Sequence, residues 1–524
     1  MGKEIGIDLG TTNTVISYVN KDGKLRQLRY NQETIIPSVI YFVSKSEYFI
    51  GSKARKFLQQ NPSAGVRNFK TRMGDTEKYD ITAENGDKFS LRSRDIAKLF
   101  LNKLVGGLEA KLLKEFGSVD GVIEKAIITV PAKFSSTQKG ETRRAAREAG
   151  LDTIKLAAEP TAAAIAYEDS QGSGEPNSVI LVYDFGGGTF DVSIIQRKGN
   201  SFDEIATGGD KNLGGNALTE RLIEAILERI EDEHGLAMPT DEEEFDEDEQ
   251  NISLTDYRLN MSEIDTMANN IKERLSEEED VTEFCNLILP DGQLTLFEVQ
   301  FTRAELEEFI REFIDETVEI TKRTIAEAKS KGIDNIDQIV LAGGSSNIPL
   351  VKESLEECLQ DHEVVFCDDV DTLISRGAAV LAKKDNITSK AITNVQMGIA
   401  ARKDLSFARF EMIINADEPL PCTRKRTFSL EHDNQATVKI DYYERDIKNY
   451  PNARSILDTG IEQIDTLIID NLPQGLRADD TDVEVEFTAQ TDGSLDIYVA
   501  LKDGRGKTIK ESNKIKFNKQ SDLE

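Results

Sequence analysis

The sequence predicts an α/β fold in which two similar lobes face each other across a cleft and a β-sandwich follows them. Three glycine-rich turns, far apart in the chain, each follow a run typical of a buried strand. Two of these turns lie inside hairpins that are followed by helical segments, which indicates a duplicated lobe. Near residue 385 the pattern changes from helices to short alternating strands, as expected for a sandwich.

Composition indicates a globular protein that does not bind polyanions. The chain has 524 residues, of which 39% are hydrophobic and 30% charged, enough for several filled cores. It has 64 Lys and Arg against 95 Asp and Glu, a net charge of −31. Because nucleic acids and anionic membranes attract positive charge, we expect neither as a partner.

The cysteines and the N-terminus predict a cytoplasmic protein. Cys285, Cys358, Cys367 and Cys422 form no CxxC pair and no metal-ligand spacing, which suits packing residues in a reducing compartment. The first ten residues contain no apolar signal core, and no later run approaches the length of a membrane span.

The two lobes are predicted from repeated hairpins. Lys3–Ile7 and Val15–Val19 alternate as strands and predict a hairpin at the edge of a mixed sheet. Val179–Tyr183 and Phe190–Ile195 repeat this plan around three consecutive glycines. We expect a ligand at the bottom of the cleft between the two lobes.

The three bends carry the residue types of a nucleotide clamp. They are Asp8–Asn13, Asp184–Thr189 and Gly343–Ser346. Glycine lets main-chain N–H groups approach phosphate oxygens, threonine hydroxyls add donors, and two aspartates can hold a hydrated divalent cation.

Between the bends, helices and one acidic run are predicted. Thr137–Ala149 forms a polar helix in which Arg143, Arg144 and Arg147 make a solvated face. Residues 239–251 are too acidic to bury a face, which predicts a mobile loop. Further amphipathic helices are expected at Ile264–Ser276, Arg303–Lys331 and Leu350–Leu359.

The predicted sandwich consists of short alternating strands with Asp-Gly turns at residues 492–493 and 503–504. Its strands are expected at Arg409–Ile414, Arg426–Leu430, Thr437–Tyr443, Val483–Ala489 and Leu495–Leu501. The expected domain limits are 1–383 for the two lobes, 384–392 for a linker, 393–518 for the sandwich and 519–524 for a polar tail.

The order of these motifs resembles the Hsp70 chaperones, DnaK-like members included. The matching segments are Ile5–Asn13, Ile128–Ala132, Glu159–Ala164, Tyr183–Asp191, Leu213–Gly215, Val340–Gly344 and Gly377–Val380. The resemblance is strong to about Lys383 and weaker to about Phe517, and we expect no counterpart of the helical lid that follows in full-length members. It implies an actin-like ATPase of two ribonuclease H-like lobes, followed by a peptide-binding sandwich.

The resemblance also implies roles for single residues. Asp8 and Asp184 would hold Mg²⁺ through water, while Lys70 would reach the γ-phosphate and the attacking water. The implied catalytic residues are Asp8, Lys70, Glu159, Asp184 and Thr189. Those implied to bind ATP or ADP, with a monovalent cation such as K⁺ at Asp191, are Gly10, Thr11, Thr12, Asn13, Gly186, Gly187, Gly188, Asp191, Gly214, Gly215, Lys272, Ser276, Gly343, Gly344, Ser345, Asn347 and Asp371.

Two parts of the pattern depart from the family. Asn269 stands where the adenine-end motif has Glu, and Asn347 where an Arg stacks on the base, so we expect nucleotide binding weaker by about 0.5–2 kcal/mol. The linker, aliphatic in the family, is the polar run Ile387–Ala391 here. Because the aliphatic linker docks by burying apolar groups, we expect weaker coupling between nucleotide and peptide.

The peptide site is predicted by the same resemblance, with core packing as the competing explanation. Its implied residues are Met397, Ile399, Arg402, Phe428, Glu431, Val438 and Ile440. The two residues expected to arch over the peptide are Arg402 and Glu431, which we expect to form an ion pair worth about 0–1 kcal/mol.

The predicted function is an ATPase chaperone that binds extended apolar segments of client proteins and hydrolyses ATP slowly as a conformational switch. The alternative is a nucleotide-bound scaffold that hydrolyses little ATP, which the polar linker favours. Expected partners are client polypeptides, a J-domain co-chaperone and a nucleotide exchange factor, with the chain itself a monomer.

Overall fold

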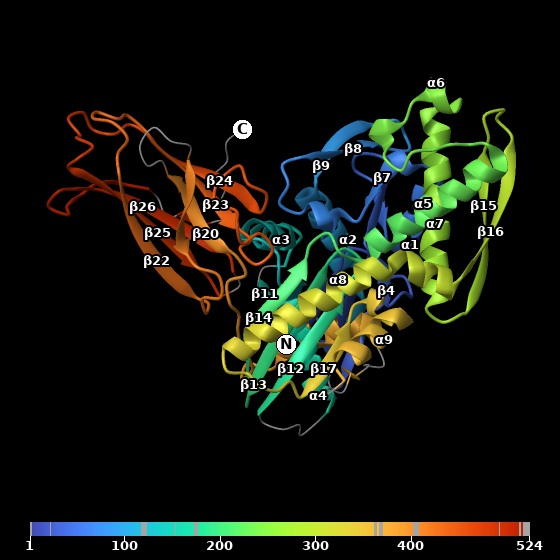
Figure 1. Cartoon of the computed structure of the whole chain (residues 1–524), viewed down its shortest axis with the longest axis horizontal. Helices are drawn as coiled ribbons and strands as arrows, with labels where there is room; N and C mark the ends of the chain where they lie inside the picture. The colour runs from blue at the N-terminus through green and yellow to red at the C-terminus, as the bar shows by residue number, and fades with distance from the viewer. Residues whose placement is uncertain are drawn as a thin grey trace.

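Two α/β lobes and a β-sandwich make up the computed structural model of the chain (Figure 1). The structure describes residues 3–20, 22–116, 123–151, 154–171, 177–360, 364–365, 370–401, 408–491, 493–512 and 515–516. The predicted fold class is confirmed.

The sheet of the first lobe is built around β1 (Lys3–Leu9), whose alternate residues Ile5 and Ile7 are buried. β1 pairs in parallel with β10 (Ile123–Val130) and antiparallel with β2 (Asn13–Val19). The hairpin was predicted at a sheet edge, and that prediction is wrong because β10, from more than 100 residues later in the chain, covers the outer side of β1. The sheet is completed by β3 (Leu25–Gln27), β4 (Ile35–Pro37) and β11 (Ile154–Ala158).

The second lobe repeats this arrangement. β12 (Asn177–Phe185) pairs antiparallel with β13 (Phe190–Lys198) and in parallel with β17 (Gln338–Ala342), as β1 pairs with β2 and β10. The sheet also contains β14 (Ser201–Asp210), β18 (Val364–Val365) and β19 (Thr388–Lys390). Both lobes therefore present a glycine-rich bend after the first strand of a hairpin.

Helices α4 (Glu159–Ser170) and α10 (Val370–Lys383) cross closely between the lobes. A side chain at Gly377 would collide with the carbonyl of Ala162, so glycine permits this crossing. The other helices are α1 (Gly51–Gln60), α2 (Ser93–Phe116), α3 (Ser136–Glu148), α5 (Gly215–His234), α6 (Glu247–Gln250), α7 (Leu254–Leu275), α8 (Arg303–Ser330) and α9 (Pro349–Cys358), with short 3₁₀ turns η1 (Pro62–Ala64), η2 (Phe69–Arg72), η3 (Glu242–Glu244) and η4 (Gly344–Asn347).

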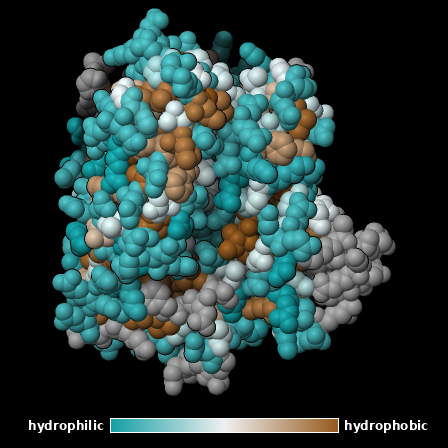
Figure 2. Space-filling model, turned by 90° about the vertical axis from the view of Figure 1, so that its right-hand side faces the viewer, coloured by the Kyte–Doolittle hydropathy of each residue, from teal (hydrophilic) through white to brown (hydrophobic). Residues whose placement is uncertain are grey.

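Smaller sheets extend the lobes at the top of Figure 1. They consist of β5 (Val39–Phe42), β6 (Tyr48–Ile50) and β7 (Gly65–Arg67), of β8 (Lys78–Thr82) and β9 (Lys88–Arg92), and of β15 (Asp280–Ile288) and β16 (Leu294–Thr302). The face on the side of β15 and β16 is mainly hydrophilic with small hydrophobic patches (Figure 2). Across the described ranges, no helix combines the length and the apolar character that a bilayer span requires.

The acidic run 239–251 contains structure that the sequence did not predict. It includes η3 and α6, and Phe245 stacks on Tyr257 of α7 with 4.2 Å between ring centroids. Arg258 of α7 forms an ion pair with Glu242. The prediction of a loop without a packed face is wrong, because one aromatic ring and one arginine on α7 hold the run against that helix.

The sandwich packs two antiparallel sheets on each other around a core that includes Val485, Phe487 and Ile497. One sheet contains β20 (Gln396–Ala401), β21 (Arg409–Ile414), β23 (Val438–Arg445) and β24 (Ile461–Ile469). The other contains β22 (Cys422–Ser429), β25 (Thr481–Ala489), β26 (Leu495–Asp503), β27 (Thr508–Glu511) and β28 (Ile515–Lys516).

The sandwich is docked on the two lobes beside α3 and β14 (Figure 1). The linker contributes β19, which pairs in parallel with residues 201–203 of β14. Arg143 of α3 is 6% exposed, and its Nη1 donates to Ser494 Oγ of the sandwich at 3.3 Å. The prediction of a solvated arginine face is therefore wrong for Arg143, which the other domain covers.

Candidate functional site

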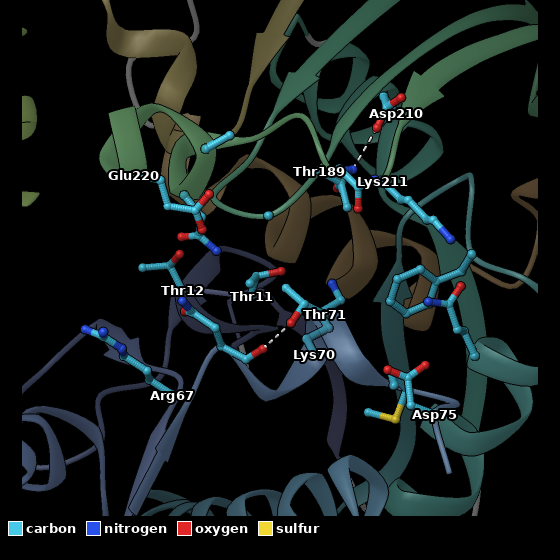
Figure 3. Close-up of a pocket in the computed structure, with 18 of the residues that line it drawn as sticks. Thr11, Thr12, Arg67, Lys70, Thr71, Asp75, Thr189, Asp210, Lys211 and Glu220 are labelled. Carbon is cyan, nitrogen blue, oxygen red and sulfur yellow. Dashed lines mark hydrogen bonds between the residues drawn. The ribbon is translucent and has the colours of Figure 1, made fainter. Parts of the chain in front are cut away.

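The three predicted bends meet between the lobes. The first lobe contributes Thr11 and Thr12, and the second contributes Thr189, all directed into one cavity (Figure 3). Gly343 of the third bend has a φ of 81°, and a side chain there would lie 2.7 Å from Asp184 Oδ1. The first two bends therefore line the cavity, and the third bend packs against the second.

The first two bends approach so closely that only glycine fits between them. A side chain at Gly187 would collide with Thr12 Oγ1, and one at Gly188 would lie 2.7 Å from Thr11 Oγ1. Gly10, Asn13, Gly186, Gly214 and Gly215 flank these contacts, with Gly214 and Gly215 at the start of α5. The hydroxyls of Thr11, Thr12 and Thr189 thus line one cavity, and hydroxyl donors of this kind suit phosphate groups.

A buried ion pair joins Lys70 and Glu159. Lys70 Nζ lies 2.7 Å from Glu159 Oε1, and the two residues are 3% and 6% exposed. Lys70 is positioned by η2, and Glu159 is the first residue of α4, where the helix dipole favours a carboxylate. The pair brings together two residues that are 89 positions apart in the chain.

Three further carboxylates face this pair. Burial, together with the charge of Glu159, raises the pKa of Asp8 to about 7 and that of Asp191 to about 7. Burial also raises the pKa of Asp184 well above its ordinary value, with Glu159 and Asp191 adding to the effect. A divalent cation would neutralise this concentration of negative charge.

Neighbouring groups fix the orientation of two of the carboxylates. Thr129 Oγ1 donates to Asp8 Oδ1 at 2.9 Å, and Thr129 pairs with Asp8 in the register of β1 and β10. Asp191 accepts from the main-chain N–H of Lys133 at 3.1 Å and from Thr189 Oγ1 at 3.3 Å. The motif Ile128–Ala132, which contains Thr129 and ends just before Lys133, was found in the sequence, but the contacts of these two residues to Asp8 and Asp191 were missed, because they depend on how distant strands and loops come together.

The other end of the predicted site is lined by α7, η4 and α10. Lys272 Nζ donates to Gly215 O at 2.8 Å and Thr219 Oγ1 at 2.6 Å, and Ser345 Oγ donates to Gly186 O at 3.0 Å. Thr219 was missed by the sequence analysis. The remaining predicted residues here are Ser276 at the end of α7, Gly344 and Asn347 in η4, and Asp371 at the start of α10.

The cavity has a volume of about 1340 Å³ and touches all three parts of the protein. Thr12 and Lys70 line it from the first lobe, Thr189 and Lys211 from the second, and Asp446 from the sandwich. Within the described ranges no three His, Cys, Asp or Glu side chains converge as direct metal ligands. The facing bends and the carboxylate cluster therefore fit a nucleotide phosphate chain with Mg²⁺.

A model of the family described as Hsp70 protein matches residues 4–524. The chain belongs to the Hsp70 family. It is 31% identical to the chaperone protein DnaK of Thermotoga maritima and of Thermotoga petrophila over 517 residues, which is 96% of this chain and 79% of each relative. It is 30% identical over 516 residues to the chaperone protein DnaK of Thermotoga neapolitana, with the same coverage. The resemblance inferred from the motifs is thus confirmed.

The residues predicted to bind peptide in this Hsp70 relative lie mainly inside the sandwich. Met397, Ile399, Val438 and Ile440 are between 4% and 6% exposed and belong to the core between the sheets. Phe428 packs against that core from a less buried position. Glu431 is exposed after β22, and Arg402 lies outside the described residues, so the predicted Arg402–Glu431 ion pair stays a prediction.

Proposed function

We propose that this Hsp70 relative binds Mg²⁺·ATP between its lobes, hydrolyses it slowly, and couples this to the binding of extended apolar segments by the sandwich. The observation that carries the proposal is the buried Lys70–Glu159 pair beside Asp8 and Asp184, where the glycine bends meet. Phosphoryl transfer to water needs positioned charge and an oriented nucleophile more than covalent help from the protein, and these residues supply both.

The geometry supports a role for each residue. Mg²⁺, when bound, would supply positive charge to the phosphates, and Asp8 and Asp184 would hold it through water. Lys70 is held by Glu159, so its ammonium stays directed at the space in front of Thr11 and Thr12. Thr189 contributes a further hydroxyl from the opposite lobe.

The sandwich and its partners belong to the same proposal. We propose the domain limits 1–383, 384–392, 393–518 and 519–524, with the described sandwich strands as the client-binding part. DnaK relatives carry the name of chaperones, which supports client polypeptides, a J-domain co-chaperone and an exchange factor as partners. The cytoplasmic location, the monomeric state and the weakened nucleotide affinity stay predictions.

A turnover assay with Lys70→Ala tests the proposal. We expect the wild type to hydrolyse ATP slowly, an apolar peptide with a J-domain protein to stimulate it, and Lys70→Ala to abolish it. Lys98→Ala is the control, because Lys98 forms an ion pair with Glu148 in which both side chains are at least one third exposed.

Removing Lys70 leaves Glu159 buried without its partner, which costs about 3–5 kcal/mol of stability. Circular dichroism and binding of Mg²⁺·ADP therefore accompany the assay. Turnover in Lys70→Ala equal to that of the wild type would overturn the catalytic assignment. A rate of ATP hydrolysis that does not change when peptide and J-domain protein are added would favour the scaffold alternative.

A further inference from the structure

The loop of residues 446–460 joins β23 to β24 in the sandwich and closes on itself. The main-chain N–H of Asp446 donates to Gly460 O at 2.8 Å, so the two ends of the loop meet. Inside the loop, Asp458 Oδ2 accepts from two successive main-chain N–H groups at 2.6 and 2.8 Å. A loop of this length with joined ends and its own internal hydrogen bonds is a compact Ω-loop.

The start of the loop is anchored on the second lobe. Lys448 Nζ donates to Thr207 O of β14 at 2.9 Å and forms an ion pair with Glu327 of α8 at 3.0 Å. Asn449 Nδ2 donates to Gly209 O of β14 at 3.4 Å. The side chain of Lys448 is only 16% exposed. The loop therefore loses these contacts when the sandwich leaves the lobes.

A later part of the loop lies on the outer edge of β21. This strand is the last of its sheet, and in the described ranges no other strand pairs along that edge. The main-chain N–H of Phe410 donates to Arg454 O at 3.2 Å, and Arg409 forms an isolated bridge with Ser455. The loop thus supplies the main-chain acceptor that an added strand would supply.

Two apolar side chains of the loop pack beside the same edge. Ala453 and Ile456 belong to a small apolar cluster, separate from the core between the sheets. The other members of the cluster are Tyr443, Ile461, Ala400 and Phe410. Leu457, the next residue, is 81% exposed. Residues 453–456 therefore show what the edge of β21 accepts, which is a main-chain carbonyl flanked by apolar side chains.

We propose that the outer edge of β21 is a further binding site for an extended peptide segment with apolar side chains, and that residues 453–456 occupy it while the sandwich is docked. Four residues expected to bind peptide are enclosed in the core, each at most 6% exposed. A segment that adds to an edge strand needs none of them, because main-chain hydrogen bonds provide its affinity. The inference rests on the proposed function, since its ligands are the same client polypeptides.

The loop competes with a client because it belongs to the same chain. Its anchors on β14 and α8 keep residues 453–456 at a high effective concentration beside β21. When the sandwich undocks, the contacts of Lys448 and Asn449 are lost and this advantage falls. A client carbonyl can then replace Arg454 O as the acceptor for the N–H of Phe410.

Binding of a labelled peptide, measured by fluorescence anisotropy, tests the proposal. The probe has the sequence of residues 450–458, which contains the segment that occupies the edge. Ile456→Asp should release the loop and bind the probe about tenfold more tightly than the wild type, if the loop fills the site about nine-tenths of the time. Leu457→Asp is the matched control, because it adds the same charge at an exposed neighbour and should bind the probe like the wild type.

A shortened loop provides a second variant that does not depend on one side chain. Residues 451–458 can be replaced by Gly-Gly-Ser, because a side chain at Gly460 would touch Tyr450 and the ends to be joined are therefore close. This variant keeps Lys448 and Asn449 and should bind the probe at least as tightly as Ile456→Asp. Hydrogen exchange should show the N–H of Phe410 unprotected without the probe and protected with it.

A third variant tests the link to docking. Lys448→Met removes the anchor on the second lobe and should give a gain in probe affinity between those of the wild type and Ile456→Asp. An affinity equal to that of the wild type would overturn the dependence on docking. Lys439→Met is the control, because Lys439 is an exposed lysine of the sandwich that pairs with Asp441.

The remaining outcomes separate this inference from the proposed function. Equal affinity for the probe in the wild type, Ile456→Asp and the shortened loop overturns the inference. Equal gains in Ile456→Asp and Leu457→Asp, or probe binding that leaves Phe410 unprotected, also overturn it. A Leu-rich peptide that binds all variants equally would then still support client binding by the sandwich. If neither peptide binds any variant, the client-binding part of the proposed function fails as well.

Discussion

The docking of the sandwich on the two lobes should depend strongly on one buried carboxylate, Glu444. Glu444 Oε1 accepts from Ser136 Oγ at 2.6 Å and from the Ser136 main-chain N–H at 3.1 Å, at the N-terminus of α3. The residue is 5% exposed and comes from the other domain. A carboxylate at this place receives two donors and the favourable end of the helix dipole.

Glu444→Ala removes both hydrogen bonds to a charged acceptor. Each bond contributes roughly 1.5–3 kcal/mol, and water that hydrogen-bonds to the freed Ser136 donors offsets part of the loss. We therefore expect the free energy of docking to weaken by about 2–4 kcal/mol. That corresponds to a factor of about 30 to 1000 in the ratio of docked to undocked molecules. Glu444→Gln retains an acceptor oxygen and should lose less.

Limited proteolysis with trypsin measures this change. Lys390 lies in β19, paired with β14, so cleavage there requires the linker to leave the sheet. We expect faster cleavage after Lys390 in Glu444→Ala. The control is Glu462→Ala, which removes an interdomain ion pair with Lys211. Both side chains are 60% exposed, so losing this pair should change the free energy of docking by no more than about 1 kcal/mol. Equal cleavage rates in Glu444→Ala and the wild type would refute the reasoning.

Three further predictions concern the lobes. Asp8→Asn should raise the thermal midpoint of the nucleotide-free protein, most clearly at about pH 8. Burial raises the pKa of Asp8 to about 7, and a buried acid with a raised pKa makes the folded state less stable as the pH rises from 3.8 through 7. The same variant should lose Mg²⁺-dependent ADP binding in calorimetry. Gly187→Ala should weaken ADP binding at least tenfold by fluorescence titration, because its side chain would collide with Thr12 Oγ1. Tyr183→Phe should cost about 1–2 kcal/mol in urea unfolding, because Thr317 Oγ1, which accepts the tyrosine hydroxyl at 2.6 Å, keeps only its own bond to a helix carbonyl.

The bends could be predicted because their signals are local. The first two bends are short runs rich in glycine, threonine and aspartate, and the third is Gly343-Gly344-Ser345-Ser346. Each follows an apolar strand, so the pattern can be recognised without knowing which residues lie nearby in the fold. Lys70 and Glu159 could be assigned only through the family motifs around them. The structure adds that they touch, which no spacing in the sequence indicates.

The domain junction could not be predicted for the opposite reason. Ser136 and Glu444 are 308 residues apart, and Arg143 is 351 residues from Ser494. A polar helix face and a polar strand residue each predict exposure to solvent when considered alone. These residues are buried because they form hydrogen bonds across the domain junction. Such bonds satisfy polar groups that the helix pattern alone would predict to be exposed to solvent.

The sandwich shows the limit of periodicity in another way. Val438 and Ile440 are two positions apart, and the alternation along β23 buries both on one face. It could not tell whether that face meets a peptide or the opposite sheet, because both partners are apolar. In the docked arrangement both side chains face the core, so a client could reach them only where the sheets separate.

The polar linker and the docked sandwich fit together once main-chain groups are considered. β19 pairs with β14 through its backbone, so polar side chains at Thr388 and Ser389 do not prevent docking. Beyond the linker, Lys448 of the sandwich donates to Thr207 O at 2.9 Å, and Asn449 donates to Gly209 O at 3.4 Å.

The linker and the sandwich therefore occupy one edge of β14 in succession. The other edge of β14 pairs with β13, and Gly209 is opposite Asp191 in that register. A contact made by the sandwich at Gly209 is thus one strand away from a carboxylate of the candidate catalytic cluster. Undocking of the sandwich would free the carbonyls of Thr207 and Gly209 on β14, and none of these contacts requires an apolar linker.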